Sequence, residues 1–167
     1  MTANPFVPRH RFRRRPQRGF TVVELMVTVA LVATLSALAA PSLRQLIATQ
    51  RVRTAASALN ESLWLARSEA VKRNTNVTFK FNKGTVTDWD VVEGLTGVGT
   101  SLHHQDGYPA ITATTAPPGD DVLFTFNPYG RLTSGTGWVK LEVASAGAFR
   151  FVCVSSTGRA SVQELAC

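Results

Sequence analysis

The feature that most constrains this chain is a largely apolar run near its N-terminus, from Phe20 to Ala40. The run holds 21 residues with no lysine, arginine or aspartate, and Glu24 is its one carboxylate. As a helix rising about 1.5 Å per residue, about 20 residues cross the roughly 30 Å hydrocarbon core of a bilayer. A basic segment precedes the run and holds six arginines: Arg9, Arg11, Arg13, Arg14, Arg15 and Arg18. This order predicts a cytoplasmic N-terminus and an exported remainder.

A cleavable secretory signal peptide is the main alternative to a retained span. It would have a short apolar core followed by a cleavage site of small residues, and residues 37–40 (Ala-Leu-Ala-Ala) fit such a site. The length of the run and the position of Glu24 favour a retained span instead. A carboxylate in hydrocarbon is costly, and it is more often functional than accidental.

The start of the run, Gly19-Phe20-Thr21-Val22-Val23-Glu24-Leu25, closely resembles the processing site of type IV pilins and type II secretion pseudopilins. The resemblance implies that a prepilin peptidase removes the leader, residues 1–19, by cutting between Gly19 and Phe20. Phe20 would then be the N-methylated mature N-terminus. The protein would be a single-pass protein of the inner membrane with a periplasmic C-terminal domain, and would later enter a pilus or pseudopilus.

Glu24 is the residue of this segment with the clearest physical role. After cleavage, the new α-amino group would lie four residues away, about one helical turn. In pilins, the corresponding Glu is thought to pair with the N-terminal amine of a neighbouring subunit during assembly. A simpler interpretation is that Glu24 only complements the positive end of the helix.

Residues 20–74 are predicted to form one long helix with a membrane-spanning half, 20–41, and an amphipathic half, 42–74. Apolar residues recur at steps of four and three in the second half: Val52, Ala56, Leu59, Leu63, Ala66 and Ala70, with Leu43, Leu46 and Ile47 before them. Pro41 lacks an amide donor and is expected to be a helix break, which kinks or locally opens the helix near the bilayer surface. A proline at this place resembles the point of pilins that melts on entry into the filament.

The end of this helix, residues 65–74, resembles the closing helical motif of the GspH/FimT family of minor pilins and pseudopilins. Lys72 and Arg73 in the last turn and Asn74 after it suit the helix dipole and a left-handed cap. The resemblance implies a FimT/FimU-type minor pilin, a structural subunit in the initiation or tip complex of a type IV pilus. Its partners would be other major and minor pilins or pseudopilins, bound through the N-terminal helix. A GspH-type pseudopilin of the type II secretion system and a pilus-tip DNA receptor are the alternatives.

Residues 75–167 read as short strands separated by turns. Strands are expected at 77–81, 85–92, 110–114, 122–126, 138–143 and 149–155, with a last one after Gly158. Turns are expected at 82–84, 117–119 and 127–130. One helix followed by several short strands predicts an α+β fold, a long helix packed on a small antiparallel β domain. Trp89 is expected to anchor its core.

The formal charge of +7 comes mostly from the leader, which holds six of the 18 basic residues. The high isoelectric point is therefore no evidence for a nucleic-acid partner. Residues 42–73 keep a net charge of +4, which indicates contact with anionic lipid headgroups or with an acidic neighbour. Cys153 and Cys167 would close a disulfide ring in an oxidising compartment, and two free thiols are the alternative.

No catalytic, cofactor or metal-binding pattern stands out, so the sequence predicts a non-enzyme with no cofactor and no metal. The pair His103-His104, with Asp106, could be imagined as a base or a metal site. We expect these residues to lie in a solvated loop over 93–109. Asp120-Asp121 is expected to form a turn.

Some FimT-type minor pilins bind DNA through a C-terminal Gly-Arg-x-Arg signature. The residues that resemble it here are Gly158-Arg159-Ala160-Ser161, where Ser161 stands in place of the second arginine. Arg159, with Arg150 and Lys140 nearby, would make few phosphate contacts, so the sequence supports only weak and salt-sensitive DNA binding.

Overall fold

The computed structural model describes residues 19–83, 87–116, 121–135 and 137–167. The chain divides into two compact units, one that ends at Ala39 and one from Ala40 to Cys167. Most of the expected leader, the expected turn at 117–119 and Asp120 lie outside the described residues, as does Gly84 of the expected hairpin turn.

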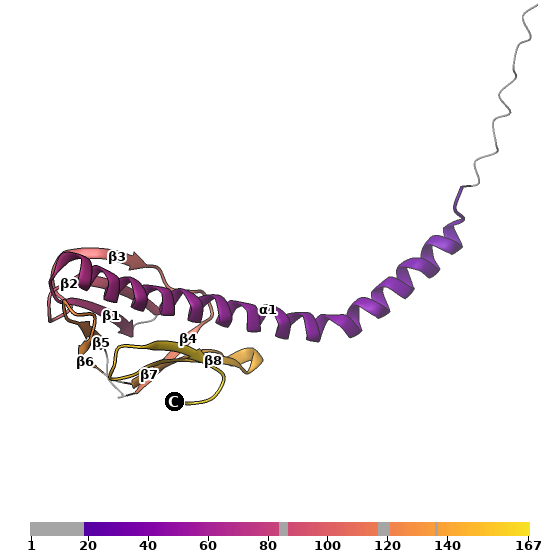
Figure 1. Cartoon of the computed structure of the whole chain (residues 1–167). Coiled ribbons are helices and arrows are strands. Elements are labelled where there is room, and N and C mark those ends of the chain that lie inside the picture. Colours follow the sequence, from indigo (N-terminus) through magenta and orange to yellow (C-terminus); the bar gives the residue numbers. More distant parts are fainter. Residues whose placement is uncertain (1–18, 84–86, 117–120, 136) are drawn as a thin grey trace, which may run out of the picture. The chain divides into compact units, whose positions relative to one another are not determined.

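One long helix, α1 (Val22–Arg73), begins the described chain and continues into the second unit (Figure 1). At its start the backbone N–H of Glu24 donates to Thr21 Oγ1 at 3.2 Å, so Thr21 is the N-cap residue. At its end Asn74 adopts a left-handed φ of 54°, and the N–H of Thr75 donates to the carbonyl of Ala70 at 3.2 Å. The predicted left-handed cap is therefore present.

The helix continues without interruption through Pro41, so the local opening expected there is not seen. A proline removes one amide donor, but its fixed φ of about −65° is itself helical, and the hydrogen bonds on either side can hold the turn. Melting at Pro41 on entry into a filament stays a prediction.

Nine strands follow α1 in the described residues, and they form two antiparallel sheets. The first sheet has the order β3-β2-β1-β5-β6, from β1 (Val77–Lys83), β2 (Thr87–Glu93), β3 (Ser101–Gln105), β5 (Asp121–Phe126) and β6 (Leu132–Ser134). The second has the order β4-β7-β8-β9, from β4 (Thr112–Ala116), β7 (Gly137–Val143), β8 (Ala148–Val154) and β9 (Ala160–Gln163). A 3-10 turn, Ala144–Ala146, joins β7 to β8. The predicted α+β class is confirmed.

Two strands were not expected from the sequence. β3 lies inside the segment predicted to be a loop, and β6 has only three residues. Both are edge strands of the first sheet. Pairing with the neighbouring strand holds them in the sheet, although their own residues have weak β propensity. The strand expected at 110–114 is present as β4, two residues later in the chain.

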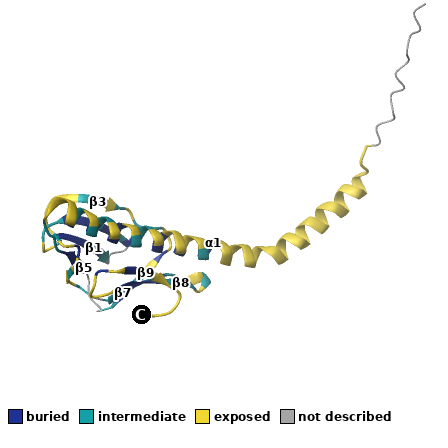
Figure 2. Cartoon of the chain, viewed as in Figure 1, coloured by how far each residue is buried: buried dark blue, intermediate teal, exposed yellow. Residues whose placement is uncertain are grey.

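The core lies between one face of α1 and the sheets (Figure 2). All six periodic apolar residues from Val52 to Ala70 are buried, as the spacing predicts. The first sheet contributes fully buried aromatic side chains, which are Phe79, Phe81, Trp89, Phe124 and Phe126. The role predicted for Trp89 is therefore confirmed. Every buried apolar residue in the described part of the chain lies between Ala48 and Ala160, so the second unit contains a core of its own.

Leu43, Leu46 and Ile47 do not join this core, although they precede its periodic residues. They are 56%, 55% and 45% exposed. At 100° per residue these three side chains leave the helix on the side away from Ala48 and Val52, which are buried.

Candidate functional site

The N-terminal part of α1 is the most unusual surface of the molecule. Every residue from Gly19 to Ile47 is exposed, including Phe20 at 82% (Figure 2). Among the described residues, α1 is the one helix long and apolar enough to cross a membrane, by length and composition. Its 18-residue apolar window is 0% buried, so no described residue of the chain buries it. Contiguous apolar surface of this extent marks an interaction site.

Gly19 and Phe20 lie just ahead of the helix, and both are exposed. The peptide bond between them is therefore not engaged in the hydrogen bonds of α1. Thr21 and Glu24 have the spacing of a capping box, in which the first side chain caps the N–H of the residue three positions on. Glu24 itself is exposed in the first turn.

Two threonine hydroxyls in the apolar half of α1 are hydrogen-bonded to the backbone of the same helix. Thr28 Oγ1 donates to the carbonyl of Leu25, and Thr34 Oγ1 donates to the carbonyl of Leu31, each at 2.8 Å. A hydroxyl that is bonded to its own backbone needs no water, which suits a helix in hydrocarbon or among other apolar helices.

The three cations named as DNA contacts do not form one site. Arg150 pairs with Leu141 across β7 and β8, whereas Lys140 pairs with Phe151. Paired residues share a face of a sheet, and neighbours alternate. Since Leu141 is buried, Arg150 lies on the core-facing side and Lys140 on the opposite side.

Carboxylates also neutralise two of these cations. Lys140 Nζ lies 2.6 Å from Glu142 Oε2, and Arg150 Nη2 lies 2.6 Å from Glu164 Oε1. Arg159 is exposed in the turn between β8 and β9, after Gly158 at a left-handed φ of 78°. No ion pair involves Arg159 within the described part of the chain.

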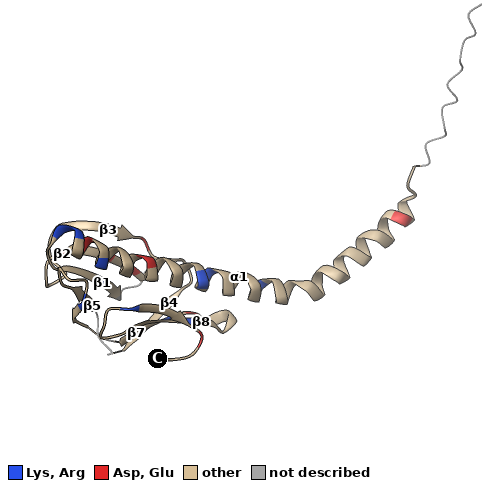
Figure 3. Ribbon diagram, viewed as in Figure 1, with Lys and Arg blue, Asp and Glu red and all other residues tan. Residues whose placement is uncertain are grey.

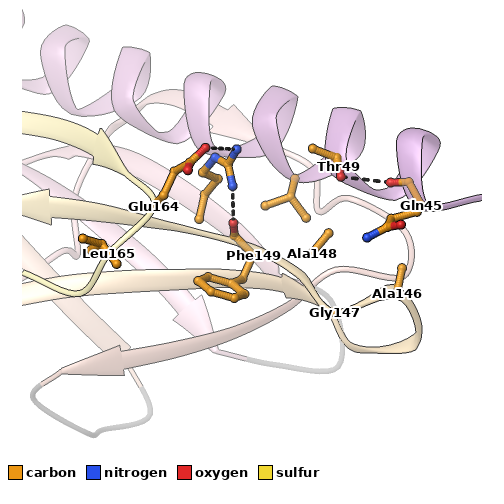
Figure 4. Close-up of a pocket in the computed structure, with 10 residues that line it drawn as sticks. Gln45, Thr49, Ala146, Gly147, Ala148, Phe149, Glu164 and Leu165 are labelled. Carbon is orange, nitrogen blue, oxygen red and sulfur yellow. Dashed lines mark hydrogen bonds and ion pairs between the residues drawn. The ribbon is translucent and has the colours of Figure 1, made fainter. Parts of the chain in front are cut away.

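A disulfide joins Cys153 of β8 to Cys167, as the sequence predicts, and it holds the C-terminal segment against the second sheet. This segment brings Glu164 and Leu165 to a cavity of about 320 Å³ beside α1 (Figure 4). Gln45 and Thr49 line the helix side of the cavity, and the Arg150–Glu164 ion pair lies in its wall. The sequence did not predict this ion pair, because the contact depends on how the C-terminal segment folds back on β8.

The expectation of a solvated loop at His103-His104 is wrong, because both residues belong to β3. His104 Nδ1 lies 2.7 Å from Asp90 Oδ1 on β2, and His104 Nε2 lies 3.4 Å from Asp106 Oδ1. The hydrogen bond and the charge of Asp90 raise the pKa of His104, and Asp106 adds to the effect. No cluster that could hold a metal ion occurs among the described residues.

A long helix whose first half is bare and apolar, and whose second half packs on antiparallel sheets, is the architecture of a pilin-like subunit. Residues 14–40 match the prokaryotic N-terminal methylation motif, and residues 55–158 match the family of the type II transport protein GspH. The second match covers more than half of the chain, so the chain belongs to the GspH family.

Two solved structures share this fold, and both are crystal forms of the type IV minor pilin FimU of Pseudomonas aeruginosa (strain PAO1). The first has a TM-score of 0.57 and 21% sequence identity, over 68% of this chain and 89% of FimU. The second has a TM-score of 0.56 and 21% identity, over 66% of this chain and 91% of FimU. No curated protein sequence matches the chain significantly.

Proposed function

We propose that this protein is a minor pilin of a type IV pilus, a structural subunit with no enzymatic activity and no cofactor. The main support for the proposal is that the apolar N-terminal half of α1 is exposed. The domain closes its core between Ala48 and Ala160, so it does not need this half for its own folding. The bilayer would cover the half first, and the helices of other pilins would cover it in the filament.

The proposal includes the processing and topology of the chain. Prepilin peptidase cuts between Gly19 and Phe20, Phe20 is N-methylated, and the domain from Ala40 onward lies in the periplasm. The match to the methylation motif and the exposure of both residues support this. Mass spectrometry of the mature N-terminus tests it. A mature chain that begins at Phe20 is expected, and one that begins near Pro41 would identify a signal-peptidase product instead.

Glu24 would set the register of assembly by pairing with the N-terminal amine of a neighbouring subunit. An ionised carboxylate in hydrocarbon is costly unless a cation accompanies it, and the new amine is the charge closest along the chain. The spacing Thr21-x-x-Glu24 also allows a second, purely structural role, in which the Glu24 carboxylate would accept from the backbone N–H of Thr21. The two roles predict different behaviour of Glu24→Gln, in which a neutral side chain of the same shape replaces the carboxylate.

The deciding experiment compares Glu24→Ala, Glu24→Gln and Thr21→Ala for cleavage and for incorporation into filaments. Glutamine can complete a capping box but carries no charge. If the charge pairs with an amine, both Glu24 variants are cleaved normally but are absent from filaments, and Thr21→Ala is incorporated. If Glu24 only caps the helix, Glu24→Gln is incorporated like the wild type. Normal incorporation of Glu24→Ala would exclude any assembly role.

A pseudopilin of the type II secretion system is the second candidate, and the description of the matching family favours it. The shared fold with a type IV minor pilin favours the first candidate. Deletion of the gene separates the two. Loss of surface pili with normal protein secretion is expected of a minor pilin, and the reverse pattern is expected of a pseudopilin.

A further inference from the structure

The stretch of α1 that follows the apolar span carries positive charge without compensation. Arg44, Arg51 and Arg53 are exposed, and no ion pair involves them in the described residues. The sequence has no aspartate or glutamate between Ala40 and Asn60. In Figure 3, α1 is red near its start, blue in its middle, and both red and blue toward its C-terminal end. We call residues 42–53 the juxtamembrane segment.

No carboxylate in the described part of the domain forms an ion pair with this segment. Glu164 lines the cavity beside Gln45 and Thr49, yet its carboxylate pairs with Arg150 of β8 (Figure 4). At the other end of the same helix, Lys72 and Arg73 both contact Glu69. The cations next to the span therefore differ from those at the end of α1, which have carboxylate partners.

Exposed apolar side chains accompany these arginines. Leu43, Leu46 and Ile47 are about half exposed, and their spacing of three and four residues places them on one side of the helix. Cations together with an apolar stripe are the composition of helices that contact the interface of an anionic membrane. The segment also lies just after the apolar run that ends at Ala40.

We propose that the juxtamembrane segment binds the headgroups of anionic phospholipids while the subunit resides in the membrane. The proposal rests on the membrane anchoring in the proposed function and adds a lipid preference to it. A lipid surface is the partner proposed here, because the segment is positively charged and lies next to the span. The alternative occupant, an acidic neighbouring subunit, is separated by the experiment below.

The distance of each arginine from the end of the apolar span predicts how much it contributes to lipid binding. Arg44 lies four residues after Ala40, about 6 Å along the helix, which is within the headgroup layer of a bilayer. Arg51 and Arg53 lie about 10–14 Å further along, more than one Debye length at physiological ionic strength. Arg44 therefore contributes most, and the two more distant arginines act only through the surface potential.

The test uses the full chain reconstituted in phosphatidylcholine vesicles, with spin-labelled phosphatidylglycerol or phosphatidylcholine as the probe. Electron paramagnetic resonance measures which lipid the protein holds at its surface. We expect the wild type to prefer phosphatidylglycerol and Arg44→Gln to lower that preference about fivefold, the effect of one arginine near a membrane surface. Arg51→Gln should lower it less than twofold. Lys72→Gln is the matched control on the same helix, and it should change nothing.

The leader arginines are present in every variant, so their contribution to the lipid preference is the same in each and does not affect the comparison. An unaltered preference in Arg44→Gln overturns the proposal, and so does an equal loss in Lys72→Gln, because net charge alone would then explain it. If Arg44→Gln keeps its lipid preference but enters filaments poorly, the segment serves an acidic subunit and the lipid proposal is wrong. A chain that restricts no lipid at all would overturn the membrane anchor as well.

Discussion

The indole Nε1 of Trp89 donates a 2.9 Å hydrogen bond to Ser62 Oγ, and this bond joins β2 to α1 inside the core. Trp89 is fully buried and Ser62 is 4% exposed. The Ser62 hydroxyl in turn donates to the carbonyl of Ala58 at 3.0 Å. The helix thus supplies one polar group at the point where the largest core side chain needs one.

Replacement of Ser62 by Ala should lower the free energy of unfolding by about 1–3 kcal/mol, because it leaves the indole N–H buried without a partner. Urea denaturation followed by tryptophan fluorescence measures the change. Ser57→Ala is the control, since Ser57 is exposed on the same helix. The variant Ser62→Ala/Trp89→Phe, which lacks both partners, should lose less than the sum of the two single changes. Equal stability of Ser62→Ala and the wild type would contradict this role.

The disulfide between Cys153 and Cys167 should stabilise the domain by about 3 kcal/mol, since it closes a ring of about 15 residues. Cys167→Ser is expected to lower the free energy of unfolding by that amount. Reduction of the wild type should give the same loss, and a reductant should not change the variant further. A wild type whose urea midpoint is insensitive to reductant would show that the bond is not closed in solution.

The features that the sequence predicted depend on residues that are close together in it. The periodicity from Val52 to Ala70 identified the buried face of α1, and alternating residues located most of the strands. The charged last turn and Asn74 marked the end of the helix. The processing segment was identified on its local pattern, and the match to the methylation motif covers it.

The features that the sequence did not predict depend on how distant segments pair. Arg150 and Lys140 were treated as neighbours on one surface, but the register of β7 with β8 places them on opposite faces. His104 joined a strand only because β2 offers an edge with Asp90 opposite it. Neither register can be read from one strand alone, since a shift of one residue would reverse the faces.

The ion pair of His104 predicts that stability depends on pH. Asp90, aided by Asp106, raises the pKa of His104 above its ordinary value of 6.5, so the folded state holds the proton more tightly than the unfolded state. The contribution is complete below the unfolded pKa and is lost as the pH rises through the folded pKa. This contribution to stability should be small, because the His104 side chain is 48% exposed.

Urea midpoints at about pH 5 and about pH 8 should differ less in His104→Gln than in the wild type. Identical pH dependence in both proteins would refute it.

Arg159 sets the upper limit on any binding of DNA by the domain. It is the exposed member of the three candidate cations, while Lys140 and Arg150 are paired with carboxylates. One free arginine supports about one phosphate contact, and each contact contributes about −0.7 to −0.9 to the slope of log K against log salt.

We therefore expect at most a weak mobility shift at low salt, with residues 40–167 as the test protein because they contain the whole core. Arg159→Ala should abolish that shift and Arg150→Ala should not, since Arg150 lies on the core-facing side of its sheet. A strong shift that survives both substitutions would place DNA binding on another surface.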